Sequence, residues 1–286
     1  MRSDEGSYLV DGPVLLAEAL LAGARVRSVY VESDADRARV WDTAEAAAAA
    51  GARVREVVPG TLAKVLDLAT PQSVVAVVDQ HRRGPDEVVR VAAIACRPLL
   101  VLVGVADPGN VGTLVRTAEA AGCAGVLLVG ECADLYNPKT VRATAGAIFR
   151  VPVARCDGAE GLLAALRLGG VRLVGTSGED GRAPEDVELG GAVALAVGSE
   201  AHGLGPEVIE CCDHLVTIPM EGSVESLNAA VAGSVLVFEA ARQRRTDPAS
   251  DPSGDPTTVV GHNDRPVASG GPTPVTPTPE HGSATR

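Results

Sequence analysis

The sequence predicts an α/β protein with a parallel sheet, and two observations carry that prediction. Short aliphatic runs recur along most of the chain and are separated by helical stretches, an order that produces right-handed crossovers and a parallel sheet. Hydrophobic residues make up 46% of the 286 positions but aromatic residues only 2%, so the core must consist of Ala, Val and Leu. Continuous aliphatic strands of this kind are typical of sheets buried on both faces.

Residues 1–80 have the pattern of a small α/β unit, and the charged Gly-Pro segment at 81–94 has the pattern of a linker with the start of a helix. Thr61 is in position to cap the last helix of this unit. The expected strands cover 25–32, 52–58 and 73–79, and the expected helices cover 13–23, 34–50 and 61–69.

A second α/β unit is expected over residues 95–245. Its strands are expected at 98–107, 125–130, 171–177, 192–200 and 214–220, and its last helix at about 226–245. After Arg245 the chain is rich in Pro, Thr, Ser, Gly and Asp. Such a segment cannot bury enough apolar surface to offset the entropy of ordering, so residues 246–286 are expected to form a disordered tail.

Charge and composition exclude several classes of protein. The net charge of −12 argues against nucleic-acid binding over the whole surface, so any RNA contact must come from a local basic cluster. The six cysteines form no C-x-x-C pair and no histidine cluster has zinc spacing, so we expect reduced thiols and no metal site. The chain opens with polar and charged residues and has no apolar run that could span a bilayer, which predicts a cytoplasmic protein without a membrane partner.

Three segments of the second unit place polar residues where a strand ends, which is where open α/β sheets bind ligands. The first segment, 107–122, leads into a helix that Asn110 is in position to cap, with Arg116 about two turns into the helix. A helix N-terminus beside a guanidinium can hold an anion. A capped helix with a surface arginine fits this segment equally well.

The second segment, 193–210, runs from an aliphatic strand into Gly198 and then Glu200, followed by further glycines that let a ligand approach the backbone closely. The run Gly203-x-Gly205 is also part of a dinucleotide fingerprint. Val208, however, stands where that fingerprint needs Gly or Ala, which disfavours an NAD-dependent oxidoreductase.

The third segment, 218–244, starts with Ile-Pro-Met, and Pro219 fits a chain that is leaving a sheet. A polar loop then leads to Ser226, a candidate N-cap for a long helix. One apolar face of this helix is expected to pack inward, and it comprises Val231, Val235 and Phe238.

Taken in this order, the segments resemble those of the SpoU/TrmH branch of the SPOUT RNA methyltransferases. That family has the motifs Asn-x-Gly-x-x-x-Arg, Gly-x-Glu-x-x-Gly-Leu and Ile-Pro-Met…Ser-Leu-Asn, which stand here at 110–116, 198–204 and 218–228. The resemblance covers about residues 98–245, and the start of the chain resembles the small substrate-binding domain that often precedes them.

The resemblance implies a parallel sheet whose C-terminal part forms a deep trefoil knot, with a small α/β substrate-binding domain in front. It also implies a homodimer that binds S-adenosylmethionine, needs no metal, and methylates the 2′-hydroxyl of a ribose in RNA, in rRNA rather than tRNA. A catalytically silent RNA-binding relative is the alternative. The intact Asn110, Arg116, Glu200 and Asn228 argue against it.

The resemblance further implies which residues form the site. The catalytic positions are Asn110, Arg116, Glu200, Ser226 and Asn228. The cofactor-binding positions are Thr176, Gly198, Ile218, Met220 and Leu227. The RNA-binding positions are Lys139, Arg142 and Arg150. Because an arginine is effectively always protonated, we expect Arg116 to position the RNA phosphate and the hydroxyl, while phosphate or water accepts the proton.

Overall fold

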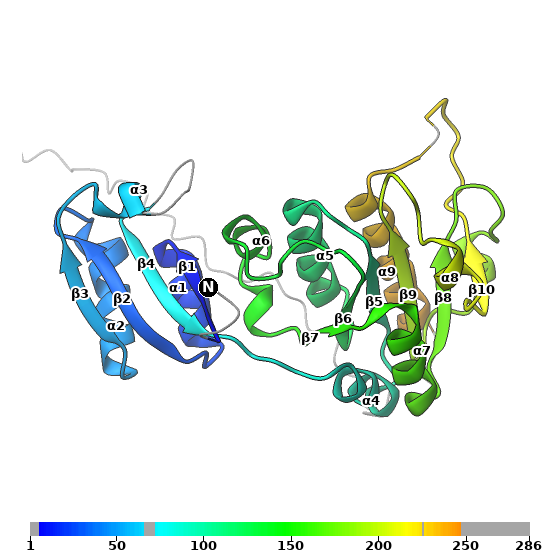
Figure 1. Ribbon diagram of the computed structural model, residues 1–286, viewed down its shortest axis with the longest axis horizontal. Helices are drawn as coiled ribbons and strands as arrows, with labels where there is room; N and C mark the ends of the chain where they lie inside the picture. The colour runs from blue at the N-terminus through cyan, green and yellow to red at the C-terminus, as the bar shows by residue number, and fades with distance from the viewer. Residues whose placement is uncertain (1–5, 66–71, 225, 247–286) are drawn as a thin grey trace, which may run out of the picture. The chain divides into compact units, whose positions relative to one another are not determined.

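The structure is a computed structural model that describes residues 6–65, 72–224 and 226–246. These residues form two β-sheets, each flanked by helices (Figure 1). The tail expected to be disordered lies outside the described residues from position 247 on. None of the described helices is both long and apolar enough to cross a membrane.

The N-terminal sheet is mixed, with its four strands in the order β1-β4-β2-β3. Its strands are β1 Ser7–Asp11, β2 Val26–Glu32, β3 Arg53–Val57 and β4 Val74–Asp79. Only β2 and β3 run parallel, while β4 is antiparallel to both β1 and β2. The sequence does not predict β1, because SYLVD has polar residues at both ends and shows neither a strict alternation nor a continuous aliphatic run.

Helices cover one face of this sheet, where Val29 and Val31 of β2 are fully buried (Figure 1). They are α1 Pro13–Leu21 and α2 Asp42–Ala49. The short α3 Thr61–Val65 lies at the end of the sheet, where the Leu62 N–H donates to Glu32 Oε1 at 3.0 Å. The single helix expected at 34–50 is instead a π-helical turn over Arg37–Trp41 that continues into α2. Of the helix expected at 61–69, only the part that forms α3 lies within the described residues.

The second sheet has six strands in the order β10-β8-β9-β5-β6-β7, and every pair is parallel, as the sequence predicts. Its strands are β5 Leu99–Val103, β6 Gly125–Val129, β7 Val153–Cys156, β8 Arg172–Thr176, β9 Val193–Gly198 and β10 His214–Val216. The four-residue β7 is not predicted. The strand expected at 214–220 ends at Val216, three residues before the proline that cannot donate to the ladder.

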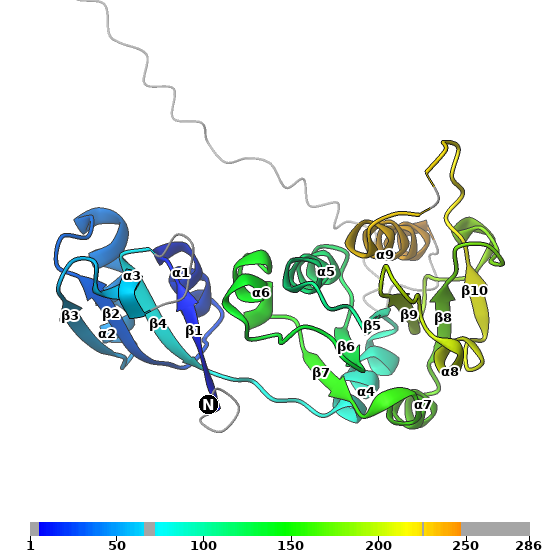
Figure 2. The same cartoon turned by 45° about the horizontal axis from the view of Figure 1, so that its top comes forward.

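Helices lie on both faces of this sheet. They are α4 Pro85–Ala95, α5 Pro108–Ala120, α6 Pro138–Ala143, α7 Gly158–Gly169, α8 Pro206–Ile209 and α9 Ala229–Thr246, with 3-10 turns at Ala147–Phe149 and Pro184–Asp186. Figure 2 shows α5 and α9 on one side of the strands and α4 and α7 on the other.

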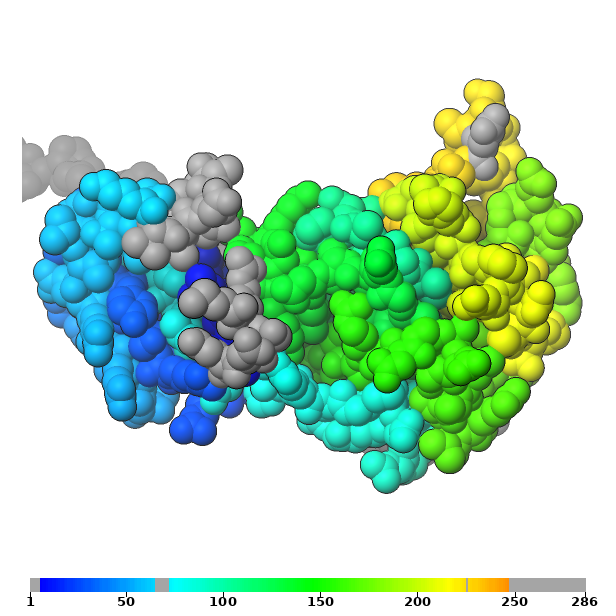
Figure 3. All heavy atoms as spheres, in the orientation of Figure 1, coloured from blue at the N-terminus to red at the C-terminus, as the bar shows by residue number. Residues whose placement is uncertain are grey.

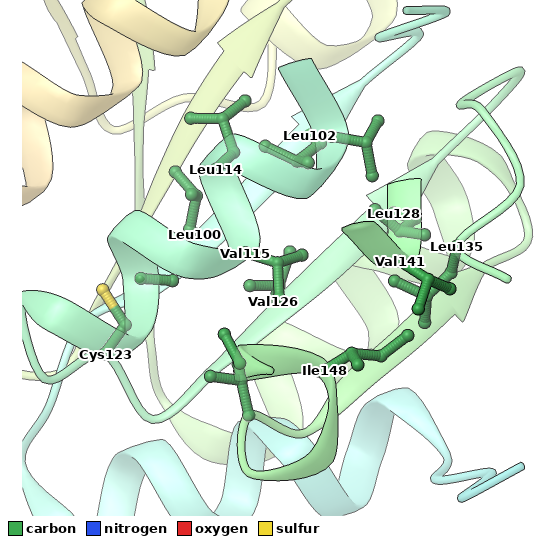
Figure 4. Packing of buried hydrophobic residues seen from close by; sticks show 14 of the residues in the cluster. Leu100, Leu102, Leu114, Val115, Cys123, Val126, Leu128, Leu135, Val141 and Ile148 are labelled. Atoms are coloured by element: carbon green, nitrogen blue, oxygen red, sulfur yellow. The ribbon is translucent and has the colours of Figure 1, made fainter. Parts of the chain in front are cut away.

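Alternate residues of the central strands therefore face two separate cores. Leu100 and Leu102 of β5 pack with Leu114 of α5 in one core (Figure 4), while Leu99 and Val101 pack in the other. All five are fully buried. Because each such side chain contributes about 1.5–3 kcal/mol on burial, these aliphatic runs hold the sheet between its helix layers and fix where its strands end.

The chain crosses the sheet between β7 and β8, so that β5 has β6 on one side and β9 on the other. In a parallel sheet, a crevice opens at the carboxyl ends of strands where the order reverses in this way. The loops that follow β5, β8, β9 and β10 all emerge at this edge. The segment after β10 projects from the surface there (Figure 3).

Candidate active site

A pocket of about 240 Å³ lies at the carboxyl ends of β8, β9 and β10. Its walls come from the residues that end these strands and from the start of α9. The structure brings together here all five predicted cofactor-binding residues, which are Thr176, Gly198, Ile218, Met220 and Leu227. Two predicted catalytic residues, Glu200 and Ser226, also line it.

The loop after β9 forms one wall because it folds back on itself. Ser199 and Gly203 exchange two backbone hydrogen bonds of 3.1 and 2.9 Å. Gly203 has a φ of +61°, a conformation that favours glycine. A Cβ atom on Gly198 would overlap the Gly203 carbonyl carbon, so only glycine fits at the end of this strand.

The loop after β8 is tied to the end of β10 and forms another wall. The Gly181 N–H donates to Thr217 Oγ1 at 2.8 Å, and the Ser177 N–H donates to the Val216 carbonyl at 2.8 Å. A Cβ on Gly181 would overlap the Val216 carbonyl carbon. Ser177 and Thr217 line the pocket and were not predicted, because each carries only a hydroxyl at a strand end and nothing local marks it.

Three predicted catalytic residues from distant segments meet in one hydrogen-bonded cluster at the pocket. Glu200 Oε1 accepts from Asn110 Nδ2 at 2.6 Å, from Asn228 Nδ2 at 3.1 Å and from the Ala229 N–H at 3.3 Å. Asn228 Nδ2 also donates to Asn110 Oδ1 at 3.2 Å. Each amide thus has one consistent orientation, in which its NH₂ group faces an oxygen of the cluster.

Asn228, and not Ser226, caps α9. Its Oδ1 accepts from the backbone N–H groups of Ala230 at 2.9 Å and Val231 at 3.3 Å. The helix consequently begins at Ala229, three residues later than expected. Ser226 remains in the loop with an exposed side chain that lines the pocket.

Asp107, and not Asn110, caps α5, since its Oδ1 accepts from the Asn110 N–H at 2.9 Å. Asn110 lies inside the first turn, which frees its amide for Glu200. Lys139 Nζ lies 3.0 Å from Asp107 Oδ2. The Lys139 ammonium, together with the Asn110 N–H, lowers the pKa of the Asp107 carboxyl below its ordinary value. The sequence signal for this cap was an Asp directly before a Pro at a strand end.

Arg116 is exposed on α5. Within the described part of the chain, no hydrogen bond or ion pair joins it to the Asn110–Glu200–Asn228 cluster or to any other residue. Its guanidinium is therefore available to a ligand.

The three predicted RNA-binding residues lie in ion pairs. Lys139 pairs with Asp107 but keeps 65% of its side chain exposed. Arg142 Nε donates to Asp11 at 3.0 Å, and that carboxylate is only 4% exposed. Arg150 pairs with Glu18 at 2.6 Å and also with Glu119. These arrangements give Arg142 and Arg150 structural partners, and their contact with RNA stays a prediction.

The described residues give no support to a dinucleotide-binding site or to a metal site. Gly205 and Pro206 begin a helix of only four residues, whereas a dinucleotide fingerprint needs a longer helix whose N-terminus holds the pyrophosphate. Among the residues that the structure describes, no three His, Cys, Asp or Glu side chains group as metal ligands.

The fold and the pocket define a class of protein. A parallel α/β sheet has at its carboxyl edge a pocket lined by glycines, apolar side chains and hydroxyl groups, with an amide–carboxylate cluster at the rim. Pockets of this kind hold small organic cofactors. The cluster beside it offers donors and acceptors to a second, polar ligand.

Comparisons with known proteins narrow this class to a family. The model of the SpoU rRNA Methylase family matches residues 97–238, and the model of the MRM3-like substrate binding domain matches residues 1–76. The chain is 32% identical over 237 residues to the 23S rRNA (guanosine(2553)-2′-O)-methyltransferase RlmP of Bacillus subtilis, covering 83% of this chain and 89% of the relative. It is 36% identical over 222 residues to the 23S rRNA (guanosine-2′-O-)-methyltransferase RlmB of Bordetella pertussis, covering 77% of this chain and 90% of the relative.

Solved structures agree. The SpoU methyltransferase AviRb from Streptomyces viridochromogenes, in complex with AdoMet, has a TM-score of 0.75 and 29% identity, covering 86% of this chain and 93% of that one. An AdoMet-bound rRNA methyltransferase from Sinorhizobium meliloti has a TM-score of 0.75 and 31% identity, covering 84% and 89%. The chain belongs to the SpoU rRNA methylase family, which confirms the resemblance drawn from the three motifs.

Proposed function

We propose that this protein transfers the methyl group of S-adenosylmethionine to the 2′-hydroxyl of a ribose in rRNA. The observation that carries the proposal is the Asn110–Glu200–Asn228 cluster at the rim of a pocket that contains all five predicted cofactor-binding residues. The relatives named above are rRNA 2′-O-methyltransferases, and two of the similar structures contain AdoMet.

The lining of the pocket fits S-adenosylmethionine. Ile218 and Leu227 offer apolar surface to an adenine ring, and the Thr176 and Ser177 hydroxyls offer polar contacts. Small residues at Gly198 and at the start of α9 leave room for backbone contacts. When bound, the cofactor would supply a methyl group on a positively charged sulfur, which a ribose oxygen can attack in line. The new O–C bond would form as the C–S bond breaks, the neutral thioether would leave, and the hydroxyl proton would pass to phosphate or water.

The residues of the chain then have distinct roles. Glu200 Oε1 already accepts three hydrogen bonds, so this carboxylate holds Asn110 and Asn228 in place and is poorly suited to accept a proton. The exposed Arg116 guanidinium binds the phosphate beside the target ribose and stabilises charge that develops on the oxygen. Lys139 pairs with Asp107 and therefore lies beside the same edge of the sheet, where it adds positive charge for the RNA backbone.

We further propose that the C-terminal part of the sheet is a deep trefoil knot. In support, the segment after β8 lies against the end of β10, with a bridge between Arg182 and Val216, although β9 and α8 intervene in the chain. The pocket lies between the loops that would form this knot.

The active form is proposed to be a homodimer. The α9 side chains Val231, Val235 and Phe238 are 48%, 41% and 47% exposed, and their spacing places them on one face of the helix. This corrects the expectation that they pack inward. An apolar stripe of this kind favours a second copy of the chain as its partner, in keeping with the homodimer that the resemblance implies.

The domain boundaries are proposals too. Residues 1–80 would bind RNA and 95–245 would hold the cofactor and carry the reaction, in line with the family models that match 1–76 and 97–238. Of the linker expected at 81–94, the residues from Pro85 on form α4, whose Val88, Val89 and Ala92 pack in the core of the second unit. An rRNA substrate would place the protein in the cytoplasm.

The test is transfer of labelled methyl from S-adenosylmethionine to deproteinised rRNA and, separately, to tRNA. We expect incorporation into rRNA at a ribose, and a loss of about 100-fold or more in Arg116→Ala. The matched control is Arg167→Ala, which removes an exposed arginine from α7 and should keep full activity. Calorimetry should show the same cofactor affinity in all three proteins.

Two results would overturn the proposal. Absence of S-adenosylmethionine binding would exclude the cofactor, and binding without transfer to any RNA would favour a catalytically silent RNA-binding protein. Transfer to tRNA alone would keep the chemistry and reject rRNA as the substrate.

A further inference from the structure

The face of the N-terminal sheet opposite its helices carries four arginines around a surface hollow of about 470 Å³. Arg53 and Arg55 come from β3, Arg27 comes from the start of β2, and Arg25 directly precedes β2. We call this surface the arginine face. None of the three motifs and none of the predicted site residues falls on it.

Strand alternation explains why these side chains point away from the core. Val29 and Val31 of β2 are buried against the helices, so Tyr30, between them, points to the other face. Arg55 is paired with Tyr30 across the parallel strands, and Arg53 is paired with Ser28. An irregularity in the pairing between Val26 and Ser28 adds Arg27 to the same hollow.

The charge of the arginine face is strongly positive although the whole chain carries −12. Among the described residues, Asp79 is the only acidic one in the lining of the hollow, where it pairs with Arg27 and lies 3.6 Å from Arg25. Arg53 and Arg55 are exposed, and within the described residues neither has a hydrogen bond or an ion pair. One carboxylate against four guanidinium groups leaves a local excess of about three positive charges.

Protection of a sheet edge does not account for this arrangement. Arginines on β3, which is an edge strand, would discourage pairing with another chain. The inner strand β2 needs no such protection, yet Arg25 and Arg27 gather at its start on the same face. A hollow lined by guanidinium groups and one tyrosine ring matches a polyanion that also has flat bases.

We propose that the arginine face is a docking site for the phosphate backbone of rRNA, with Tyr30 as a stacking surface for a base. The proposal rests on the proposed function for the choice of RNA, and it adds the surface that holds the substrate away from the reacting ribose. Guanidinium groups bind phosphate through paired hydrogen bonds. A chain with a net negative charge must concentrate such contacts in one place.

The test compares two double variants of the full chain that lose the same charge. Arg53→Gln/Arg55→Gln removes two arginines from the arginine face. Arg90→Gln/Arg167→Gln removes two exposed arginines from α4 and α7. Filter binding to a transcript of 23S rRNA, measured across a range of salt concentrations, gives the Kd and its salt dependence. Circular dichroism checks that both variants are folded.

We expect Arg53→Gln/Arg55→Gln to raise the Kd about 10-fold or more and to reduce the slope of log Kd against log salt by about one to two. Its KM for rRNA should rise while kcat at saturating rRNA and the affinity for S-adenosylmethionine stay unchanged. Arg53→Lys/Arg55→Lys should recover part of the affinity because the charge is kept. The control variant should bind like the wild type.

Equal Kd values for the two double variants would reject the arginine face as the docking site for rRNA, whether or not the protein methylates rRNA. Displacement of the transcript by millimolar GMP or inorganic phosphate would also overturn it, in favour of a small-anion site. Methyl transfer is measured in a separate assay. If the wild type binds rRNA through these arginines but transfers no methyl group, the proposed function is rejected while the docking role of the arginine face is retained.

Discussion

At the scale of single residues, the carboxylate of Glu200 organises the site. One of its oxygens accepts hydrogen bonds from Asn110, Asn228 and the N–H of Ala229. The last of these belongs to the first turn of α9, where the partial positive charge of a helix N-terminus favours a carboxylate. Glu200 therefore links α5, the loop after β9 and α9 at the rim of the pocket.

This positioning role predicts different outcomes for two substitutions of Glu200. Glu200→Gln keeps an oxygen acceptor and should lower kcat only about 10-fold, because a charge-assisted hydrogen bond is roughly twice as strong as a neutral one. Glu200→Ala removes the acceptor and should lower kcat about 100-fold or more. Steady-state kinetics measures kcat for both variants. If Glu200 accepted the proton, the two variants would be equally inactive.

A second prediction concerns Asp107 and pH. Its pKa is lower in the folded protein than in the unfolded chain because of Lys139 and the Asn110 N–H. The stabilisation it provides is thus complete at neutral pH and is lost as the pH falls below about 4, through the folded pKa. In Lys139→Met, NMR titration should show the Asp107 pKa rising toward its ordinary value. A substitution at the other lysine, Lys64→Met, should leave it unchanged, and an unaltered titration in Lys139→Met would reject the pairing.

At the scale of elements, α9 joins the core, the site and an exposed apolar stripe. Leu236 and Val237 are fully buried, while Val235 and Phe238 are more than 40% exposed. A Cβ on Gly233 would overlap the Leu114 side chain, so α9 packs closely on α5 at this point. The helix is apolar on more than one face, which is why periodicity alone selected the wrong face as the buried one.

The exposed apolar stripe of α9 predicts that charged residues placed on it will prevent dimerisation. Val235→Asp/Phe238→Asp should convert a dimer into a monomer, because two buried carboxylates would lack partners in the interface. Light scattering coupled to size-exclusion chromatography measures the mass. Leu168→Asp, at a position 76% exposed on α7, is the control and should remain dimeric. A monomeric wild type would exclude the homodimer.

At the scale of the whole molecule, an ion pair connects β1 of the N-terminal sheet with α6, a helix that packs on α5. Asp11 ends β1, and its buried carboxylate accepts from Arg142 of α6 and from the Gln72 N–H at 3.1 Å. Tyr8 of β1 also lies against Tyr136, with ring centroids 4.7 Å apart. The chain thus has polar and aromatic contacts between the N-terminal sheet and the segment that precedes α6.

Removal of one partner from this ion pair should destabilise the protein. Arg142→Ala leaves the Asp11 carboxylate buried without its cation, at a cost of about 2–3 kcal/mol, less than for a fully buried pair because Arg142 is 31% exposed. Urea unfolding measures the change. Arg155→Ala removes an exposed arginine that, among the described residues, bonds to two backbone carbonyls, and it should cost less than 1 kcal/mol. Equal losses of unfolding free energy in the two variants would show that the Asp11–Arg142 pair stabilises the protein no more than an exposed arginine does.

The local pattern of the sequence determined much of this protein. Aliphatic runs predicted the parallel sheet and most of its strands, because burial on both faces demands apolar side chains at every position. The motifs also identified Asn110, Glu200 and Asn228, since each belongs to a segment that follows the carboxyl end of a strand. The strands β1 and β7 escaped prediction because their sequences, SYLVD and VARC, mix polar and charged residues with apolar ones and contain no continuous aliphatic run.

Only the tertiary structure decided which of these residues meet. Glu200 bonds to Asn110, 90 positions away, and the loop after β8 reaches the end of β10 because both strands end at one edge of the sheet. Arg142 pairs with Asp11, which is distant in the chain. Asn228 caps α9 although Ser226 is an equally suitable cap by residue type. Residue type sets what a side chain can bond, but the path of the backbone through the sheet sets which partner lies within about 3 Å.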